Sequence, residues 1–595
     1  MTAPVETDDA PPRGVETRYL RRLAPYVRPH LGLALAATAL LLAEGALQLA
    51  GPMLTRDVVD VAVPAGAIGR VQRDALLLIG ALLVQFACGW GESILTARLG
   101  QRVMHALRRD LFAHVQRLDI AWFDRTPVGR IVTRVTSDVE SLNELFTAGV
   151  VAGLGDLFTV TLIAALMLAV DWRLALATFA VVPAIAFASR TFQSRVRAAF
   201  REIRGKVARM NAFLQERLTG MRVVQLFGQE RRERDAFAER NQEHLAAQLR
   251  SVTLYAFFLP AIEVLTSVAL ALLLVSAAGR VNAGTVTVGT VAAFLQLARR
   301  FFQPLQDLAD KYNTLQQAVA ACERIFGLLD TPVTIVDGSA TLPPRRGGVR
   351  VAFEGVWFSY DATAPDPVWV LRDVSFAAAS GETLAIVGHT GAGKTTIINL
   401  LLRFHDPQRG RITLDGVDIR TLPLSVLRAQ VGYVQQDIFL FADDIAANIR
   451  LASERTAVEV EAAARAVGAD RVIARLPGGY AHVLGERGAT VSVGERQLLS
   501  FARAVAADPP LLLLDEATSA VDSTIEAEIQ AALGTLRAGR TTIAVAHRLS
   551  TVVDAAQILL MHHGEVRERG THRELLALDG LYARLTQLQR GAQVP

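Results

Sequence analysis

The residues best suited to chemistry by type and spacing lie in GHTGAGKTT, directly after the strand-like run TLAIV. Their spacing matches G-x-x-x-x-G-K-[ST] between a strand and a helix, an arrangement that binds nucleotide phosphates, and a chance glycine-rich turn is a poor alternative. Lys394 reaches the terminal phosphates, and Thr395 offers its hydroxyl to Mg²⁺. The residues assigned to ATP binding here are Gly388, His389, Thr390, Gly391, Ala392, Gly393, Lys394, Thr395 and Thr396.

A second group of chemically active side chains ends the run LLLLDEATSAVD, residues 511–522. Its continuous apolar start is typical of a buried strand. We expect Asp515 to hold the metal and Glu516 to orient and deprotonate the attacking water. Phosphoryl transfer needs positioning and charge neutralisation more than covalent chemistry, and these residues supply both.

The stretch GATVSVGERQLLSFARA reads as the beginning of a helix. Ser492 can cap its first turn, and Glu495 can reach back to the Ser492 N–H, which predicts a capping box. Such a terminus is also an anion site, because its free N–H groups and the helix dipole point outward.

The elements that position these residues belong to an α/β domain, predicted over 349–590 from alternating strand-like and helical runs. Residues 331–348 are rich in Pro and Gly and are expected to form a linker. Residues 16–330 form a separate membrane domain, and 1–15 a disordered tail. The sequence thus predicts a helical membrane domain of six transmembrane helices with long cytoplasmic extensions, fused to a P-loop nucleotide-binding domain.

The composition fits a membrane protein, since 51% of the 595 residues are hydrophobic and mean hydropathy is +0.30. A net charge of only +4 gives no field that would recruit nucleic acid, and two cysteines make no disulfide framework. The polar, acidic N-terminus is no cleavable signal peptide. Apolar stretches long enough to span a bilayer are expected near 31–54, 74–97, 146–170, 174–189, 253–278 and 286–306.

The segments between the second and third spans, and between the fourth and fifth, are long, rich in arginine and expected to be helical. The positive-inside rule places them and both termini in the cytoplasm. Asp171-Trp172-Arg173 is predicted to form a tight polar turn between the third and fourth spans.

Ionisable groups inside spans usually face a bundle interior or a water-filled cavity. Four acidic residues lie inside the expected spans, and their functional interpretation is an acidic cavity that favours cationic amphiphiles. The alternative is that these acids lie near the membrane interface, or form hydrogen bonds within the bundle while neutral. Arg299 and Arg300 argue against a uniformly acidic pathway. The candidate cavity residues are Glu44, Glu92, Asp156 and Glu263.

With these motifs in order, the chain resembles the ATP-binding cassette family over nearly its whole length, as a half-transporter of the exporter type. By that resemblance Tyr360 stacks on adenine, Gln436 senses Mg²⁺ with Thr395 and Asp515, and His547 contacts the γ-phosphate. Ser519 and Asp522 match the loop that crosses the dimer interface. Coupling segments are expected near 120–130 and 213–225.

The same resemblance identifies Ser492, Val493, Gly494 and Glu495 as the signature that faces the nucleotide bound by a second subunit. Its usual form is Leu-Ser-Gly-Gly-Gln, so here a glycine is replaced by Val493 and the glutamine by a negative Glu495. Because the chain's own catalytic set is complete, this departure favours a heterodimer with a second half-transporter, and a homodimer is the alternative.

The interpretation that results is an ATPase coupled to export of hydrophobic or amphiphilic, including cationic, substrates across a bacterial plasma membrane. Its cofactors are ATP and Mg²⁺, and its partners are a second half-transporter, the lipid bilayer and a small amphiphilic substrate, with no nucleic acid. A lipid flippase is the nearest alternative. A siderophore importer with the exporter fold and an ATP-gated channel or receptor also remain open, whereas a soluble cassette ATPase lacks the spans.

Overall fold

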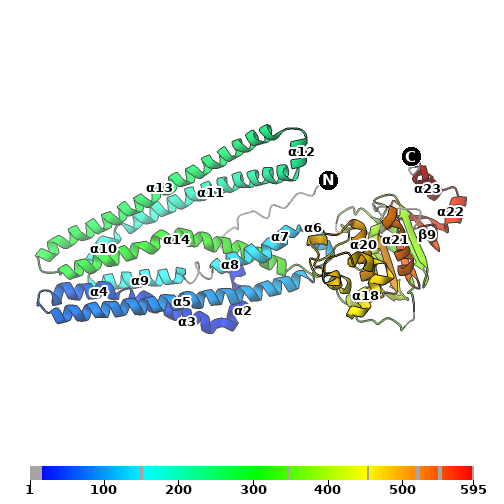
Figure 1. Ribbon diagram of the computed structural model, residues 1–595. Helices are drawn as coiled ribbons and strands as arrows, with labels where there is room; N and C mark the ends of the chain where they lie inside the picture. Colours follow the sequence, from blue (N-terminus) through cyan, green and yellow to red (C-terminus); the bar gives the residue numbers. More distant parts are fainter. Residues whose placement is uncertain are drawn as a thin grey trace. The chain divides into compact units, whose positions relative to one another are not determined.

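The computed structural model describes residues 17–145, 152–344, 347–362, 364–451, 454–488, 490–515, 523–546 and 552–591. They form two compact units (Figure 1). The membrane unit consists of residues 1–116 and 128–331, and the cassette unit of residues 117–127 and 332–595. The short segment 117–127 therefore packs with a domain that lies far later in the sequence.

The membrane unit is built from helices, among which α3, α5, α9, α11, α13 and α14 each have 17 or more residues. Their bounds are α1 (Thr17–Arg21), α2 (Ala24–Val27), η1 (Arg28–His30), α3 (Leu31–Leu47), α4 (Ala50–Asp57), η2 (Val58–Ala62), α5 (Ile68–Val115), α7 (Val128–Thr133), η3 (Arg134–Asp138), α8 (Val139–Glu144), α9 (Ala152–Val170), α10 (Trp172–Phe179), α11 (Val182–Thr219), α12 (Met221–Leu226), α13 (Glu230–Asn282) and α14 (Val288–Leu329). The predicted arginine-rich helices are confirmed as the later parts of α5 and α11.

Five helical stretches among the described residues are long and apolar enough to cross a membrane: Ala24–Ala62, Ile68–Val115, Gly153–Val170, Trp172–Thr219 and Glu230–Asn282. The sixth expected span, 286–306, lies within α14. This helix is not among the five, since Arg299, Arg300 and three glutamines interrupt the apolar residues of 286–306. The predicted membrane domain is confirmed, with five spans identified by composition.

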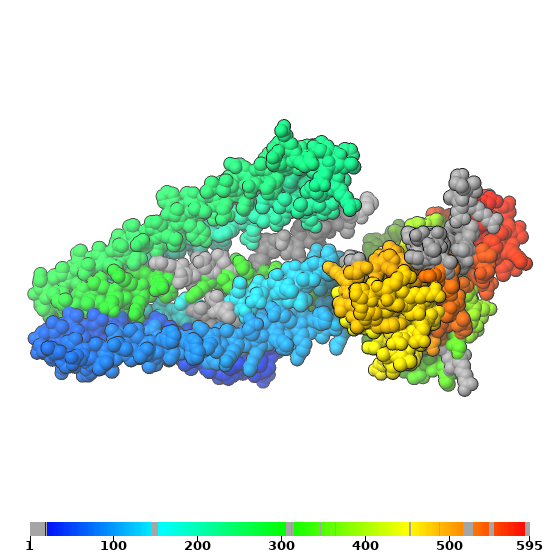
Figure 2. Space-filling view, in the orientation of Figure 1, coloured from blue at the N-terminus to red at the C-terminus, as the bar shows by residue number. Residues whose placement is uncertain are grey.

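The long helices of the membrane unit pack in pairs (Figure 1). Helix α3 lies along α5, and α11 lies along α13 with α12 joining their far ends. Figure 2 shows the α11–α13 pair as a surface that separates from α14 over the part of its length that leads to α12. Phe294 and Phe302 of α14 are buried in the core of this unit with Ile163, Met167 and Leu174.

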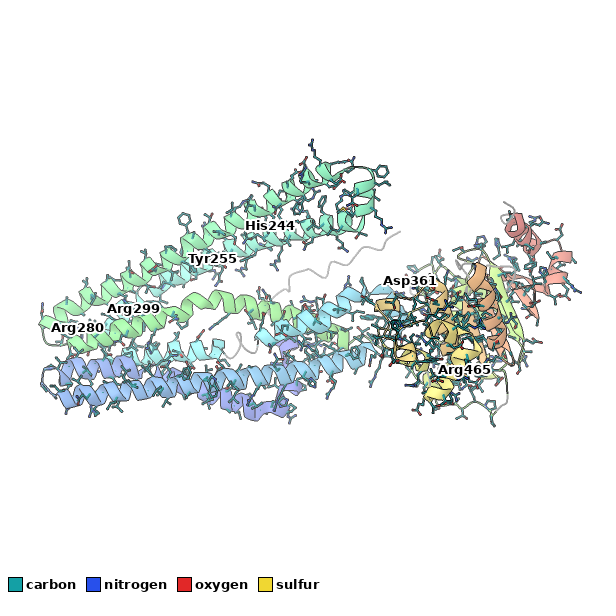
Figure 3. The ribbon with its side chains drawn as sticks, viewed as in Figure 1. His244, Tyr255, Arg280, Arg299, Asp361 and Arg465 are labelled. Atoms are coloured by element: carbon teal, nitrogen blue, oxygen red, sulfur yellow. The ribbon has the colours of Figure 1, made fainter. Side chains whose placement is uncertain are left out.

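The polar turn after the third span is confirmed. Asp171 caps α10 by accepting the N–H groups of Arg173 and Leu174, both at 3.0 Å. The same carboxylate accepts two hydrogen bonds, at 2.9 and 2.7 Å, from Arg280 near the end of α13 (Figure 3). A bidentate pair of this kind fixes both distance and orientation, so it ties α10 to α13.

Two sheets form the frame of the cassette unit. The four-stranded sheet has the order β2-β1-β4-β5 and the six-stranded sheet the order β10-β9-β3-β8-β7-β6. Strands β6, β7, β8, β3 and β9 run parallel, and β10 pairs antiparallel with β9. The strand bounds are β1 (Val351–Phe358), β2 (Leu371–Ala378), β3 (Thr383–Gly388), β4 (Arg409–Leu414), β5 (Val417–Asp418), β6 (Val431–Val434), β7 (Leu511–Asp515), β8 (Thr541–Val545), β9 (Gln557–His562) and β10 (Glu565–Gly570).

Helices cover the sheets, and α17, α18, α19 and α21 pack around α20, which also contacts β6. Their bounds are α6 (Ile120–Arg125), α15 (Lys394–Leu401), η5 (Ile419–Thr421), α16 (Leu424–Ala429), α17 (Ile445–Arg450), α18 (Ala457–Ala466), α19 (Ala469–Ile473), η6 (Gly479–Ala481), η7 (Glu486–Gly488), α20 (Val493–Ala507), α21 (Ser523–Arg537), α22 (His572–Ala577) and α23 (Leu581–Gly591). Every residue of β7 is buried, as the apolar run predicted. The α/β nucleotide-binding domain is thereby confirmed.

Candidate nucleotide-binding site

The loop between β3 and α15 folds around its own lysine. Positive φ angles of 83° at Gly391 and 98° at Gly393 turn the chain in a conformation that residues with a Cβ rarely adopt. The buried Lys394 ammonium donates to the carbonyl oxygens of Gly388 at 2.7 Å and His389 at 3.1 Å. The loop is thus closed over a positive charge at the N-terminus of α15, which is a site suited to phosphate.

The glycines of this loop are required for different reasons. A Cβ at Gly388 would lie 2.3 Å from the Met561 carbonyl oxygen of β9, which is backbone and cannot turn aside. A Cβ at Gly393 would lie 2.6 Å from a methyl carbon of Leu371. At Gly391 a Cβ would meet nothing within 4 Å, so only the positive φ restricts that position. Position 391 is therefore the open side of the loop.

Tyr360 lies two residues after β1, and its backbone is tied to the segment 117–127. Its hydroxyl lies 3.1 Å from the Thr396 hydroxyl, and its carbonyl accepts a hydrogen bond from Arg125 of α6 at 2.7 Å. The ring is 43% exposed and lies edge-on to His405, with 5.2 Å between centroids. An exposed ring held at its backbone and hydroxyl is available for stacking. Arg125 was missed by the sequence analysis, because nothing local marks a partner 235 residues away.

Oxygen-bearing side chains gather where the parallel strands end. Asp515 ends β7 and is buried, Gln436 is exposed two residues beyond β6, and Thr395 is exposed at the start of α15 after β3. The carboxyl ends of parallel strands share one edge of the sheet, where ligands of open α/β sheets bind. Carboxylate, hydroxyl and amide oxygens are the hard donors that suit Mg²⁺, so these residues fit that ion.

Tyr433 of β6 is a partner of Asp515 that the sequence analysis did not identify. Burial, the Asp515 charge and a hydrogen bond to that carboxylate together raise the pKa of Tyr433 to about 12. The phenol therefore stays protonated and donates to Asp515. The parallel register of β6 and β7, in which Tyr433 is paired with Leu513, brings the two side chains together.

The predicted capping box at the signature is confirmed. The Glu495 carboxylate accepts the Ser492 N–H at 2.8 Å, and the Ser492 hydroxyl accepts the Glu495 N–H at 3.3 Å. Gly494 is buried, whereas Val493 is 49% exposed at the first position of α20. A negative carboxylate and an apolar side chain therefore stand where the signature meets solvent.

Helix α20 is tied to the segment that follows Gln436 by Arg503. Its guanidinium donates to the carbonyl oxygens of Asn448 at 2.8 Å and Phe439 at 3.2 Å. The Asn448 side chain in turn binds both the N–H and the carbonyl of Phe441, at 2.9 and 3.0 Å. Movement near Gln436 can therefore be transmitted to the signature helix through Arg503, a residue that no local motif marks.

Four expected site residues lie outside the described residues: Glu516, Ser519, Asp522 and His547.

The four acids of the membrane unit fall into different environments. Glu44 of α3 and Glu92 of α5 interact electrostatically, and Glu92 accepts a hydrogen bond from Thr96 at 2.9 Å. Asp156 forms an ion pair with Lys311 of α14. Glu263 lines a groove of ≈ 460 Å³ along α13 together with Pro260, Val264, Ser267, Val268 and Ala271. Two acids are thus neighbours, one is paired, and one lies apart.

Arginines on α14 face polar partners in this unit. Arg300 donates to the carbonyl oxygen of Gln48. Arg324 forms a bidentate pair with Asp138, at 3.0 and 2.7 Å. Figure 3 shows Arg299 of α14 near Arg280 of α13, at the end of the unit where α13 ends and α14 begins.

A phosphate-binding loop and oxygen ligands at one sheet edge, in a chain that also carries membrane-spanning helices, define an ATPase fused to a membrane domain. Residues 34–305 match the family model of the ABC transporter transmembrane region, and residues 371–519 match the ABC transporter model. The chain belongs to the ABC transporter family. It couples ATP hydrolysis, with Mg²⁺, to transport.

Relatives match the chain over most of its length. The chain is 34% identical over 570 residues to the ATP-dependent lipid A-core flippase of Syntrophus aciditrophicus, covering 96% of this chain and 94% of that one. It is 37% identical over 525 residues to the "Probable multidrug resistance ABC transporter ATP-binding/permease protein YheH" of Bacillus subtilis, covering 87% and 76%. The solved structure of a bacterial Atm1-family ABC exporter with ATP bound is 29% identical, with a TM-score of 0.75, covering 94% and 98%. The chain is therefore an ABC exporter half-transporter, a multi-pass membrane protein that works as a dimer.

Proposed function

We propose that this exporter moves hydrophobic and amphiphilic substrates, cationic ones among them, as the catalytically complete half of a heterodimer in a bacterial plasma membrane. The observation that carries the substrate class is the proximity of Glu44 and Glu92 on two neighbouring apolar helices. Carboxylates placed inside membrane helices usually serve a pathway or a ligand. Two of them together favour a positively charged guest.

At the nucleotide site, the proposed roles rest on the motifs and on the family to which the chain belongs. Tyr360 stacks on adenine, Lys394 neutralises the terminal phosphates, and Thr395, Gln436 and Asp515 hold Mg²⁺, which supplies charge neutralisation at the phosphates. Tyr433 keeps Asp515 oriented by donating its phenol proton. Glu516 and His547 are proposed to activate water and contact the γ-phosphate, with Ser519 and Asp522 at the dimer interface.

Transmission to the membrane helices is proposed to use α6 and the α12 region. Helix α6 lies in the expected first coupling segment, and Arg125 ties it to the backbone of Tyr360 at 2.7 Å. The side chain of Asp119, just before α6, accepts the N–H of Thr334 at 2.9 Å. ATP-dependent closure can do work only if it favours one membrane conformation, and these contacts give α6 a direct link to the nucleotide domain.

The heterodimer is supported by the altered signature. Val493 is exposed and Glu495 is negative, so the γ-phosphate of a facing nucleotide would meet an unfavourable charge. The phosphate loop of the same chain, in contrast, keeps every residue of its motif. A partner with the usual signature would complete an active site with this chain's Lys394 and Glu516.

The substrate proposal is tested by neutral amide substitutions in proteoliposomes. Glu44→Gln and Glu92→Gln are expected to reduce transport of a cationic dye severalfold while leaving basal ATP hydrolysis intact. Asp156→Asn and Glu263→Gln provide comparisons in the paired and isolated environments. Unchanged dye transport in all four variants would contradict a cationic substrate.

The dimer proposal is tested by the ATPase activity of the purified chain alone, with Glu516→Gln as the control. An inactive chain that hydrolyses ATP only after a second half-transporter is added supports the heterodimer. Brisk hydrolysis by a dimer of this chain, lost in the control, would establish a competent homodimer.

Lipid translocation is a second candidate, favoured by the identity to a lipid A-core flippase over nearly the whole chain. Arg299 on α14 is an exposed cation to which a lipid phosphate would be attracted. A fluorescent lipid moved between leaflets in an ATP-dependent manner, with no dye transport, would favour this function.

A further inference from the structure

Three histidines gather beside the phosphate loop and have no part in the proposed ATPase chemistry beyond the membership of His389 in that loop. His389, His562 and His563 each present a ring nitrogen, and these atoms all lie within 4.8 Å of one another. Ring centroids are 5.1 Å apart for His389–His562, 5.3 Å for His389–His563 and 4.2 Å for His562–His563.

The backbone places these residues together. His562 ends β9, and His563 and Gly564 form the two-residue turn into β10, with φ angles of 49° and 82°. Two positive φ angles at a two-residue hairpin are typical of a type I′ turn, which is tight and defined. Strand β9 pairs in parallel with β3, and Met561 is the register partner of Gly388. His562 follows Met561 and His389 follows Gly388, so the pairing of the two strands brings these two histidines together.

The turn is also anchored from its other side. The Gly564 carbonyl accepts the N–H of Arg372 at 2.8 Å, and a Cβ at Gly564 would lie 2.3 Å from the Val370 carbonyl oxygen. The hairpin tip is therefore packed against the start of β2. Its two imidazoles are presented at a fixed place.

One of the three rings is already oriented for coordination. His389 Nδ1 lies 2.7 Å from the Thr390 carbonyl oxygen, which can only accept, so Nδ1 carries the proton. The lone pair is then on Nε2. A backbone carbonyl that fixes the tautomer in this way is the usual outer-shell partner of a metal-bound histidine. His389 and His563 are exposed and His562 is partly exposed, so an ion can enter.

We propose that His389, His562 and His563 form a binding site for a borderline transition-metal ion, with Zn²⁺ as the preferred physiological occupant. Imidazole suits Zn²⁺, Ni²⁺ and Cu²⁺ rather than Mg²⁺, which prefers oxygen. Three histidines with an open fourth position form a known kind of zinc site. A tetrahedral zinc needs its nitrogens about 3.4 Å apart, given Zn–N bonds near 2.0–2.1 Å. Rotation of the two exposed side chains, His389 and His563, can bring the three nitrogens to this distance.

The ionisation of the rings is compatible with such a site. Burial, the two neighbouring histidines and Arg567 lower the pKa of His562, which favours the neutral form that binds metal. Arg567 is itself paired with Glu565 at 2.8 Å. Metal binding should accordingly weaken as the pH falls and the imidazoles become protonated.

The test uses the full chain in detergent, purified without a polyhistidine tag and titrated with Zn²⁺ alone by calorimetry. One zinc per chain is expected. His562→Gln and His563→Asn should each weaken this binding by more than about tenfold, a loss of about 1.4 kcal/mol. Asparagine is chosen at 563 because it tolerates the positive φ. His244→Asn, on α13 of the membrane unit, is the control and should bind zinc as the unmodified chain does (Figure 3).

The visible absorption of Co²⁺ in the same variants gives a second readout that does not depend on ATP. An intense spectrum of a nitrogen-ligated, four-coordinate ion is expected in the unmodified chain and should be lost in both hairpin variants. Both variants should bind a fluorescent ATP analogue as the unmodified chain does, which shows that they are folded. Zinc affinity and cobalt spectra that are unchanged in His562→Gln and His563→Asn would overturn the proposal.

Discussion

The carboxylate of Glu495 accepts the backbone N–H of Ser492 at 2.8 Å, while the Ser492 hydroxyl accepts the N–H of Glu495. These reciprocal bonds satisfy two N–H groups at the start of α20 and hold the acid at the helix N-terminus, where the dipole stabilises it. The same groups form the surface that we propose to face a second subunit's nucleotide. Stability of the helix and affinity for phosphate therefore make opposite demands on residue 495.

Glu495→Gln should separate these demands, since glutamine can still reach the Ser492 N–H but carries no charge. We expect ATP hydrolysis at the site closed by this signature to rise roughly two- to fivefold, corresponding to about 0.4–1 kcal/mol. Thermal stability should change little. The matched control is Glu459→Gln, which alters the same kind of capping box on α18. Equal rates before and after Glu495→Gln would show that the charge does not limit this site.

Tyr433→Phe removes the hydrogen bond to Asp515 while retaining the ring. The buried carboxylate then loses a donor, a change that costs about 1–3 kcal/mol. We expect ATP hydrolysis to fall roughly tenfold, with a higher Mg²⁺ concentration needed for half-maximal rate, and ATP binding to be retained. Tyr582→Phe, which loses a 2.7 Å bond to His572 elsewhere in the cassette unit, serves as the comparison. A normal Mg²⁺ dependence in Tyr433→Phe would contradict the positioning role.

Alanine substitutions should rank the glycines of the phosphate loop. Gly391→Ala meets only the strain of a positive φ, about 1–2 kcal/mol, so reduced but measurable ATP binding is expected. Gly388→Ala forces a Cβ against the Met561 carbonyl oxygen and should abolish nucleotide binding. Gly381 lies outside the loop, has a φ of 80°, and would place a Cβ in open space. Gly381→Ala therefore measures the cost of backbone strain alone. The measurement is affinity for a fluorescent ATP analogue, and the opposite order for positions 388 and 391 would be inconsistent with the packing.

His405 should make the stability of the chain depend on pH. Burial lowers its pKa below the usual 6.5, so the neutral ring is favoured in the folded state. The unfolded chain then binds the proton more readily, and the contribution to stability is present above pH 6.5 and lost as the pH falls below it. His405→Phe should flatten this decline in melting temperature, measured in detergent. His482→Phe should leave it in place, and a decline of equal slope in both variants would assign it to other groups.

The parts of the fold that local patterns encode were predictable. An apolar run predicted β7, and Ser492 with an acid three residues later predicted the capping box. Glycine and lysine spacing predicted the loop around Lys394. Each of these depends on neighbours within a few residues, where periodicity and capping chemistry determine the outcome.

The remaining features depend on contacts between residues that are distant in sequence. The pairing of Asp156 with Lys311, and the link from Arg503 to Phe439, need the packed helices and strands before they exist. The sixth span was expected from apolar content, but the polar residues of α14 keep it from meeting a simple hydropathy criterion. No local signal distinguishes a buried partner from a solvated charge at such positions.

The membership of residues 117–127 in the cassette unit has a consequence for biosynthesis. Helix α6 is translated long before the strand that precedes Tyr360, so it leaves the ribosome without the domain to which it belongs. The Arg125–Tyr360 bond closes a loop of 235 residues, and the membrane helices α11 and α13 are made in the interval. Contacts of such long sequence separation form slowly. The final folding step of the nucleotide domain should therefore follow the insertion of the helices that were synthesised before it. A chain whose helices are inserted incorrectly should fail to complete that step.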